Sequence, residues 1–266
     1  MTAFTNDFAL NLAVAEIEKT YGDRVDVQSK AKTLLKFGRN DDLSTTSETL
    51  WTVGGNETYV TTNVIDSIVS SSAADTATVS IEGHTVSGTG ADAQYTSVIQ
   101  TVILNGQTRV ALTTPLARVS RMAIVDDSTV AGSVVVYENS ALTAGVPDDV
   151  TKVHNEIDGI VGDTQSFKAA TTFSNTDYFV MTALSISVNR QQSRSVDFTL
   201  ERRVPGGLFL PIVRMSASST GGPTINKNFY PYVVVPKNSD LRIVGISSST
   251  ATEVNASFQG ILAQVL

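Results

Sequence analysis

The side chains that most often carry catalysis are sparse in this sequence. It has two histidines, His84 and His154, and no cysteine. His84 follows Glu82 and Gly83 at the end of an expected strand, and His154 lies two residues before Glu156 in another. A hydrolase triad needs a nucleophile, a base and an orienting acid, and the Gly-x-Ser-x-Gly turn is absent. We therefore expect packing or hydrogen-bonding roles for both histidines, and no enzyme activity.

Adjacent acidic residues are the candidate metal ligands. Calcium takes about six to eight oxygen ligands, usually from alternating positions of one loop, whereas neighbouring aspartates point apart. Aspartate also stabilises turns by bonding its own backbone. We expect turns at all three pairs and no bound metal, with the last pair the best of the three for a structural cation: Asp41-Asp42, Asp126-Asp127 and Asp148-Asp149. No phosphate-binding glycine motif occurs, so no cofactor is expected.

Sugar chemistry is the next possibility. A glycosidase needs two carboxylates beside a sugar site, and the many acidic residues leave that open. However, Trp51 is the one tryptophan and aromatic residues make up 7% of the chain. A carbohydrate-binding module needs an exposed aromatic platform, and the candidate tyrosines are scattered, although the last two lie in a dense aromatic stretch: Tyr59, Tyr95, Tyr178, Tyr230 and Tyr232. We expect them to fill the core, with a binding module kept as an alternative.

Basic residues form three small clusters, Lys30 to Arg39, Arg118 with Arg121, and Arg202 with Arg203. They can be solvated strand faces that block edge aggregation, or they can form ion pairs with acidic partners. The formal net charge of −7 argues against general nucleic-acid binding. The predicted partner interface combines apolar and basic residues: Phe4, Phe8, Leu12, Lys36, Arg39, Arg118 and Arg121.

The first segment is the one good helix candidate. Thr5 or Asn6 can cap it, and Gly22 can end it. Its apolar residues form two rows, one with Phe4, Phe8, Leu12 and Ala15 and one with Leu10, Val14 and Ile17. Residues 25–37 are ambiguous, and the run from Asn40 to Asp42 indicates a turn. Residues 1–50 are therefore expected to form a helix and an anchoring arm.

From Trp51 onward the sequence alternates as strands do. Residues 51–140 are expected to form a first β domain, in which Asn105-Gly106 between two alternating runs predicts a hairpin. Residues 139–149 indicate a linker or long loop. Residues 141–266 contain about eight expected strands, starting at Lys152, which suggests a jelly-roll-like sandwich. The predicted fold class is mainly β, with two β-sandwich-like units after a short helix.

The composition suits faces that other molecules cover. Charged residues make up 17% of the chain, below the usual quarter, and hydroxyl and amide residues fill the gap. A charge buried at an interface needs a partner, so neutral surfaces are easier to cover. The first residues have no secretion-signal pattern, and no apolar run reaches the roughly 18 residues that span a bilayer. We expect a soluble protein without a membrane partner.

Several segments together resemble a family of virion structural proteins of tailed phages. They are Leu35 to Asn40, Ile81 to His84, Leu104 to Arg121, Val235 to Arg242 and Phe258 to Leu262. The resemblance implies a particle component of two β units, located in the virion, assembled in the host cytoplasm and without catalytic residues. The expected partners are the major capsid protein or other virion proteins and further copies of this chain, with a trimer favoured.

The first hypothesis from this resemblance is a capsid-decorating or head-associated protein. A tail adaptor, fibre anchor or receptor-binding protein is the alternative. Deletion of residues 1–40 is expected to abolish attachment to particles if the helix is the anchor.

Overall fold

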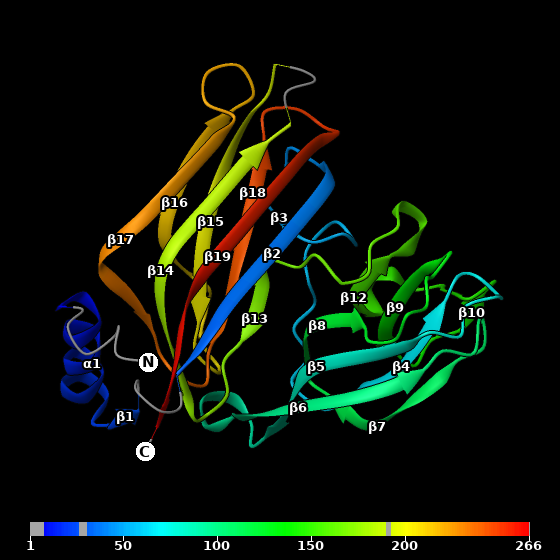
Figure 1. Ribbon diagram of the computed structural model, residues 1–266, viewed down its shortest axis with the longest axis horizontal. Coiled ribbons are helices and arrows are strands. Elements are labelled where there is room, and N and C mark those ends of the chain that lie inside the picture. The colour runs from blue at the N-terminus through cyan, green and yellow to red at the C-terminus, as the bar shows by residue number, and fades with distance from the viewer. Residues whose placement is uncertain (1–7, 27–30, 190–192, 266) are drawn as a thin grey trace.

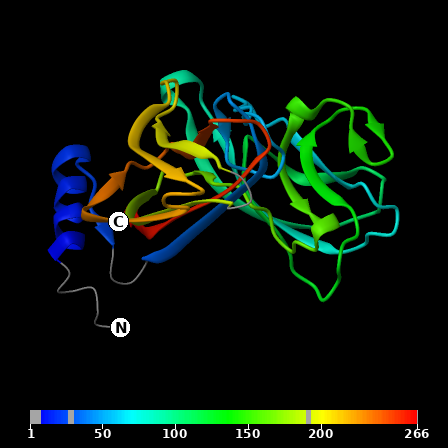
Figure 2. The ribbon, with the colours of Figure 1, turned by 90° about the horizontal axis from the view of Figure 1, so that it is seen from above.

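The computed structural model describes residues 8–26, 31–189 and 193–265. It is mainly β, with one α-helix, α1 (Phe8–Tyr21), near the N-terminus. Figure 1 shows a large two-layered sandwich with α1 against one end and a smaller β unit projecting from its side, and Figure 2 shows the same two bodies from above. The predicted fold class is confirmed. No helix in the described part of the chain is long and apolar enough to cross a membrane.

Two sheets form the large sandwich. In the first, β2 (Lys32–Leu43) pairs with β19 (Thr252–Val265), which pairs with β14 (Asp177–Val188), which pairs with β17 (Thr224–Val235); the short β1 (Val25–Asp26) also joins β19. The second contains β18 (Asp240–Ser247), β15 (Ser195–Arg203) and β16 (Leu210–Ser218). Two short strands, β3 (Glu48–Thr49) and β13 (Ala170–Thr172), lie along the free edge of β18.

This strand order is that of a jelly roll. If β3 and β13 count as one interrupted strand, the sandwich has eight strands, and in chain order the sheets read 1-8-3-6 and 2-7-4-5. Such an arrangement consists of two Greek keys. Its first strand is β2, so the predicted arm, residues 1–50, supplies an edge strand of one sheet and part of an edge strand of the other. Its part from Lys32 to Thr49 is therefore built into the sandwich.

The smaller unit is an insertion between β3 and β13. The chain leaves the sandwich at Leu50 and returns at Ala169, and these two residues and Ile243 of β18 form a ring of three backbone hydrogen bonds, of 2.8, 2.9 and 3.0 Å. Trp51 and Lys168 form an antiparallel bridge just beyond it. Gly38 of β2 packs against this neck, and a Cβ there would lie 2.4 Å from the Ala169 Cβ. We call the segment from Leu50 to Ala169 the inserted unit.

Two sheets also make up the inserted unit. One has the order β12-β9-β4-β7 and the other β6-β5-β8. Their strands are β4 (Ile65–Ser70), β5 (Thr78–Ser87), β6 (Gln94–Ile103), β7 (Val110–Leu116), β8 (Arg118–Ile124), β9 (Ser133–Glu138) and β12 (Val153–Asp158), beside a small hairpin of β10 (Leu142–Thr143) and β11 (Val146–Pro147). Aliphatic side chains such as Ile65, Ile81 and Val134 fill the space between the sheets.

Several local predictions need correction. The turn at Asn105-Gly106 exists, with Gly106 at φ 54°, but its flanking strands separate, because β6 pairs with β5 and β7 pairs with β4. The expected turn from Asn40 to Asp42 lies inside β2. The strand from residue 152 pairs with β9 in the inserted unit, and the predicted linker contains β10 and β11. Periodicity shows where strands are but carries no information about their partners.

The helix packs with one row of its apolar residues. Leu10, Ala13 and Ile17 are buried, whereas Leu12 is 44% exposed and Ala15 is also exposed. The buried row is therefore the second predicted one, not the row that contains Leu12. Gly22, at φ 72°, ends the helix as expected. Phe4, the caps Thr5 and Asn6, and the side chain of Phe8 lie outside the described residues.

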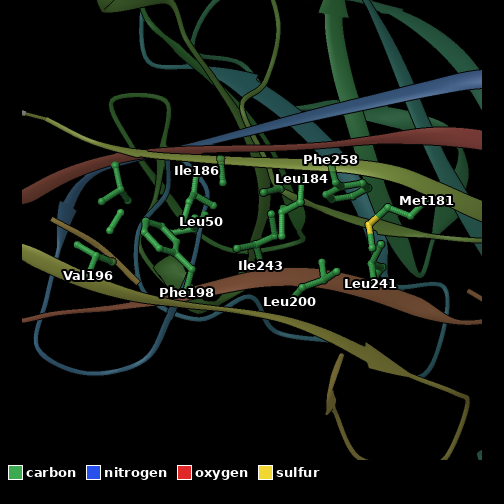
Figure 3. Packing of buried hydrophobic residues seen from close by; sticks show 14 of the residues in the cluster. Leu50, Met181, Leu184, Ile186, Val196, Phe198, Leu200, Leu241, Ile243 and Phe258 are labelled. Atoms are coloured by element: carbon green, nitrogen blue, oxygen red, sulfur yellow. The ribbon is translucent and has the colours of Figure 1, made fainter. Parts of the chain in front are cut away.

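The main core lies between the two sheets of the sandwich. Figure 3 shows Leu184, Ile186 and Phe258 of the first sheet pointing toward Phe198 and Ile243 of the second. Successive residues of a strand point to opposite faces, so each of these apolar positions alternates with an outward one. The outward positions therefore decide what the sandwich presents to its surroundings.

Candidate interaction surface

The outer face of the first sheet has one half that lies away from α1. Among the residues that the structure describes, no other helix or strand lies in front of this half (Figure 1). Cross-strand pairing aligns its outward residues in three rows of four, running from β17 across β14 and β19 to β2: Thr224, Ser187, Asn255 and Arg39; Asn226, Ser185, Ser257 and Phe37; Asn228, Ala183, Gln259 and Leu35. All twelve are exposed or half-exposed. We call them the bare face.

Small hydroxyl and amide groups dominate the bare face, and Arg39 is its one charged residue. The Arg39 guanidinium lies 3.2 Å from Asp41, 3.5 Å from Asp158 and 3.0 Å from Asp163. It also lies over the Phe167 ring, 5.3 Å from its centre. These contacts hold Arg39 within its own chain. A protein could cover the bare face without desolvating an unpaired charge, which is the costly step in burying polar surface.

A shallow hollow of about 130 Å³ lies in the bare face. Phe37 and Phe167 line it together with the short polar residues Ser185, Ser187, Asn255 and Ser257. Leu35 and Phe37 of β2 are 46% and 41% exposed at the same edge of the face. The surface therefore combines a neutral floor, a recess beside two aromatic rings and a projecting aliphatic side chain.

The predicted interface residues are divided between the inside of the chain and its surface. Lys36 and Arg118 are buried where the inserted unit meets the sandwich. The Lys36 Nζ donates to the carbonyl of Ser120, and Arg118 donates to the carbonyls of Val60 and Ala117. These two side chains have almost no surface left for a partner, so the internal contact takes the place of the predicted external one.

Arg118 also forms a buried ion pair. Its Nε lies 3.0 Å from the Asp240 carboxylate, which Arg203 contacts as well. Burial alone would raise the Asp240 pKa, but the two guanidinium groups outweigh it and lower the pKa. The rings of Tyr59 and Tyr95 both lie 5.0 Å from the Arg118 guanidinium carbon. This cluster joins β8 of the inserted unit to β18 of the sandwich.

Two buried lysines lie at the same junction: Lys36 reaches across it from the sandwich, and Lys168 lies on the side of the inserted unit. Lys168 forms an ion pair with Glu57 and donates to the carbonyls of Val119 and His154. Burial lowers the pKa of Lys168, although Glu57 opposes the shift. Burial, with the nearby Lys168 charge, also lowers the pKa of Lys36 to about 7. The junction therefore contains specific, fully desolvated contacts, whose geometry sets the position of the inserted unit.

Arg121 has the surface position that the sequence predicted. It is largely exposed and contacts Glu82 at 3.0 Å and Gln165 at 3.1 Å. Its partner-binding role, like that of Arg39, stays a prediction. The described part of the chain does not bring the predicted interface residues into one patch, since α1 and Arg121 lie on different bodies of the molecule.

The histidines occupy separate buried sites. Burial lowers the pKa of His84 to about 4, and its Nε2 lies 3.2 Å from the Ser97 hydroxyl. Burial, reinforced by Lys168, lowers the pKa of His154 to about 3, so its 3.0 Å contact with Glu138 is a hydrogen bond from a neutral ring. Neither contact forms the nucleophile, base and acid series that a triad requires.

Asp126-Asp127 and Asp148-Asp149 lie in loops, whereas Asp41-Asp42 lies inside β2, so the turn predicted there is wrong. Asp126 accepts backbone hydrogen bonds from Thr78 at 2.6 Å and Ser128 at 3.1 Å. Asp149 caps a short 3-10 helix at Thr151. Among the described residues, no group of three or more acidic or histidine side chains is placed to hold a metal ion.

The tyrosines do not form one platform. Tyr59 and Tyr95 stack on Arg118, Tyr178 is buried under α1, and Tyr230 is exposed beside the half-buried Tyr232. Sequence reasoning did not identify the bare face. Its signal was present in the alternation of residues 184–188 and 254–259, where uncharged polar residues occupy every second position.

Comparisons with known proteins give little further information. No family model matches the chain, and no curated protein matches it. Among solved structures, that of infectious bursal disease virus strain Gx is 7% identical and covers 95% of this chain and 78% of its own, with a TM-score of 0.22. The VP2 subviral particle of the same virus is 7% identical over 95% and 77%, with a TM-score of 0.22. These scores are too low to carry an argument about fold or function.

Proposed function

We propose that this chain is a structural component of a tailed-phage particle, a capsid-decorating or head-associated protein that binds the shell and associates with copies of itself, with a trimer as the favoured assembly. The observation that carries the proposal is the bare face. A four-stranded surface of short neutral residues, with its one cation already paired, can be covered by another protein at little desolvation cost.

Two further observations support the proposal. The jelly roll is an architecture used by viral capsid domains, as well as by lectins and cupins, so this support is an analogy of fold. The buried contacts of Arg118 with Asp240 and of Lys36 with the Ser120 carbonyl hold the inserted unit in a defined position on the sandwich. A particle component benefits from such preorganisation, because binding then costs less conformational entropy.

A position on the tail, as an adaptor, fibre anchor or receptor-binding protein, uses the same surfaces. The number of copies in purified particles separates the two positions, since a shell protein follows the capsid lattice and a tail protein follows the lower symmetry of the tail. A carbohydrate-binding module is a second class of function. The exposed Tyr230 favours it, and loss of glycan-array binding in Tyr230→Ala would support it.

The main experiment adds the purified chain to particles that lack it and measures co-sedimentation. We expect saturable binding to these particles, and recovery of the chain from wild-type particles by mass spectrometry. Absence of the chain from wild-type particles together with no binding would overturn the proposal. Deletion of residues 1–40 is unsuitable as a test, because it removes most of β2 and with it an edge of the sandwich.

A further inference from the structure

We infer that the bare face binds the bare face of a second copy, with Leu35 of each copy in the hollow beside Phe37 and Phe167 of the other. This inference rests on the proposed function and deepens it. The proposed function depends on the bare face, and the inference names a second copy of the chain as one partner of that face. The contact has two-fold symmetry, so it produces pairs of chains or joins two larger assemblies such as trimers.

Charge is the first argument for a second copy as the occupant. A two-fold contact brings the same surface of both copies together, so a face with a net charge repels itself. The chain as a whole carries −7, yet the bare face has Arg39 alone, and three carboxylates of the same chain already contact it. The sequence suggests two kinds of partner, a shell protein and a second copy of this chain. A charged shell protein would be attracted to a face of opposite charge. The bare face is neutral, so it favours the second copy.

Shape is the second argument. The hollow has a volume of about 130 Å³, and a cavity of roughly 150 Å³ holds a benzene-sized group. Leu35 is the projecting aliphatic side chain of the same face, and it lies one row away from Phe37 along β2. A two-fold axis lying parallel to the two sheets, between Leu35 and the hollow, places each leucine in the hollow of the other copy. One surface thus contains both the projection and its recess.

The polar floor is consistent with the same contact. Ser185, Ser257 and Asn226 carry hydroxyl and amide groups that both donate and accept hydrogen bonds. A surface made of such groups can bond to an identical copy of itself, which a surface of donors alone or acceptors alone cannot do.

Sedimentation of the isolated chain tests the inference. We expect the wild-type mass to be an even multiple of the 28.2 kDa chain, and Leu35→Arg to halve it. Ile103→Arg is the matched control, because Ile103 is an exposed aliphatic residue of β6 in the inserted unit. It should leave the mass unchanged. Circular dichroism and the urea midpoint check that each variant is folded.

A charge exchange tests the pairing itself. Leu35→Lys and Ser187→Asp should each halve the mass, and the double variant should restore it through ion pairs between copies. Ser187 lines the hollow, but it lies two strands away from β2, and its row is four residues from the row of Leu35, so the two side chains are too far apart to pair within one chain. An odd-multiple wild-type mass, an unchanged mass in Leu35→Arg, or a double variant that stays at half mass would overturn the inference.

Particle binding separates the two proposals. If the mass does not respond to Leu35→Arg but the wild-type chain still binds particles, the self-contact is wrong and the proposed function stands. If the chain is absent from particles while its mass is halved as expected, the self-contact stands and the proposed function fails.

Discussion

The two ends of one sheet face differ in what covers them. At one end, Leu10 and Ile17 of α1 pack on Tyr178, Val180 and other apolar residues of the first sheet. At the other end, the same strands present the serines and asparagines of the bare face. The strands are continuous across both ends. A single sheet can therefore combine a face closed by its own chain with a face left open for another molecule.

A bulge in β14 lets the outer face of the sheet change from apolar to polar along the strand. Thr182 is an extra residue in β14, because Met181 pairs with Gly260 and Ala183 with Gln259. One extra residue shifts the alternation of side chains along the bulged strand. As a result, Val180 points outward to α1, whereas Ser185 points outward to solvent. Gly260 lies beside the bulge, and because it has no side chain, the backbone of β14 can pass close to it there.

The largest expected effect is at the covered end. Ile17→Ala removes a fully buried side chain from the contact of α1 with the sheet, and we expect a loss of about 2 to 5 kcal/mol in the free energy of unfolding. Leu12→Ala on the exposed side of the same helix is the control, with a change within about 0.5 kcal/mol. Urea titration measures both. Equal losses would mean that α1 does not pack as described.

The boundary between the ends should be the next most sensitive place. A Cβ at Gly260 would lie 2.2 Å from the Val180 carbonyl oxygen and 2.6 Å from the Phe179 ring. We expect Gly260→Ala to cost about 1 to 3 kcal/mol, because the backbone must move to relieve the overlap. Gly221→Ala, which meets no atom within 4 Å, is the control for urea unfolding. If Gly260→Ala left the free energy of unfolding unchanged, the backbone at the bulge could move without cost.

Acid should loosen the covered end more than the bare end. Contacts from Lys237 and Tyr178 lower the Asp23 pKa, so the stabilisation is present above the unfolded pKa, about 3.9, and is lost as pH falls through the lower folded value. Asp23→Asn should remove this part of the acid dependence of the thermal midpoint below about pH 4. Asp197→Asn, at an exposed carboxylate of the second sheet, is the control. Identical acid profiles in wild type and Asp23→Asn would contradict the contact.

The smallest change is expected on the bare face itself. Ser185→Ala removes a half-exposed hydroxyl of the bare face, so the unfolding free energy should change by no more than about 0.5 kcal/mol. The contrast with Ile17→Ala is the measure of how different the two ends are. A loss above about 1 kcal/mol for Ser185→Ala would indicate that the face is already used within the chain.

Much of the fold could be predicted from local patterns. The strands Ser133–Glu138 and Asp240–Ser247 lie where alternation placed them, and Gly22 ends the helix. The candidate surface was harder to predict. Lys36 and Arg118 were interpreted as surface cations, because a sequence does not show that a segment more than a hundred residues away supplies Asp240 to Arg118. Burial of charge depends on such distant partners.

The sequence by itself determined which strand segments would have one buried face and which would have two. Val254 to Gln259 alternates and supplies the bare face, whereas Gly260 to Ala263 is continuously small or apolar and lies under α1. This follows from local chemistry, because the period of a strand is two wherever it packs. Tertiary structure alone decided that β3 and β13 are parts of one strand position, with the inserted unit between them. That arrangement depends on hydrogen bonds between Leu50, Ala169 and Ile243, and residues so far apart in the chain leave no periodic signal of their meeting.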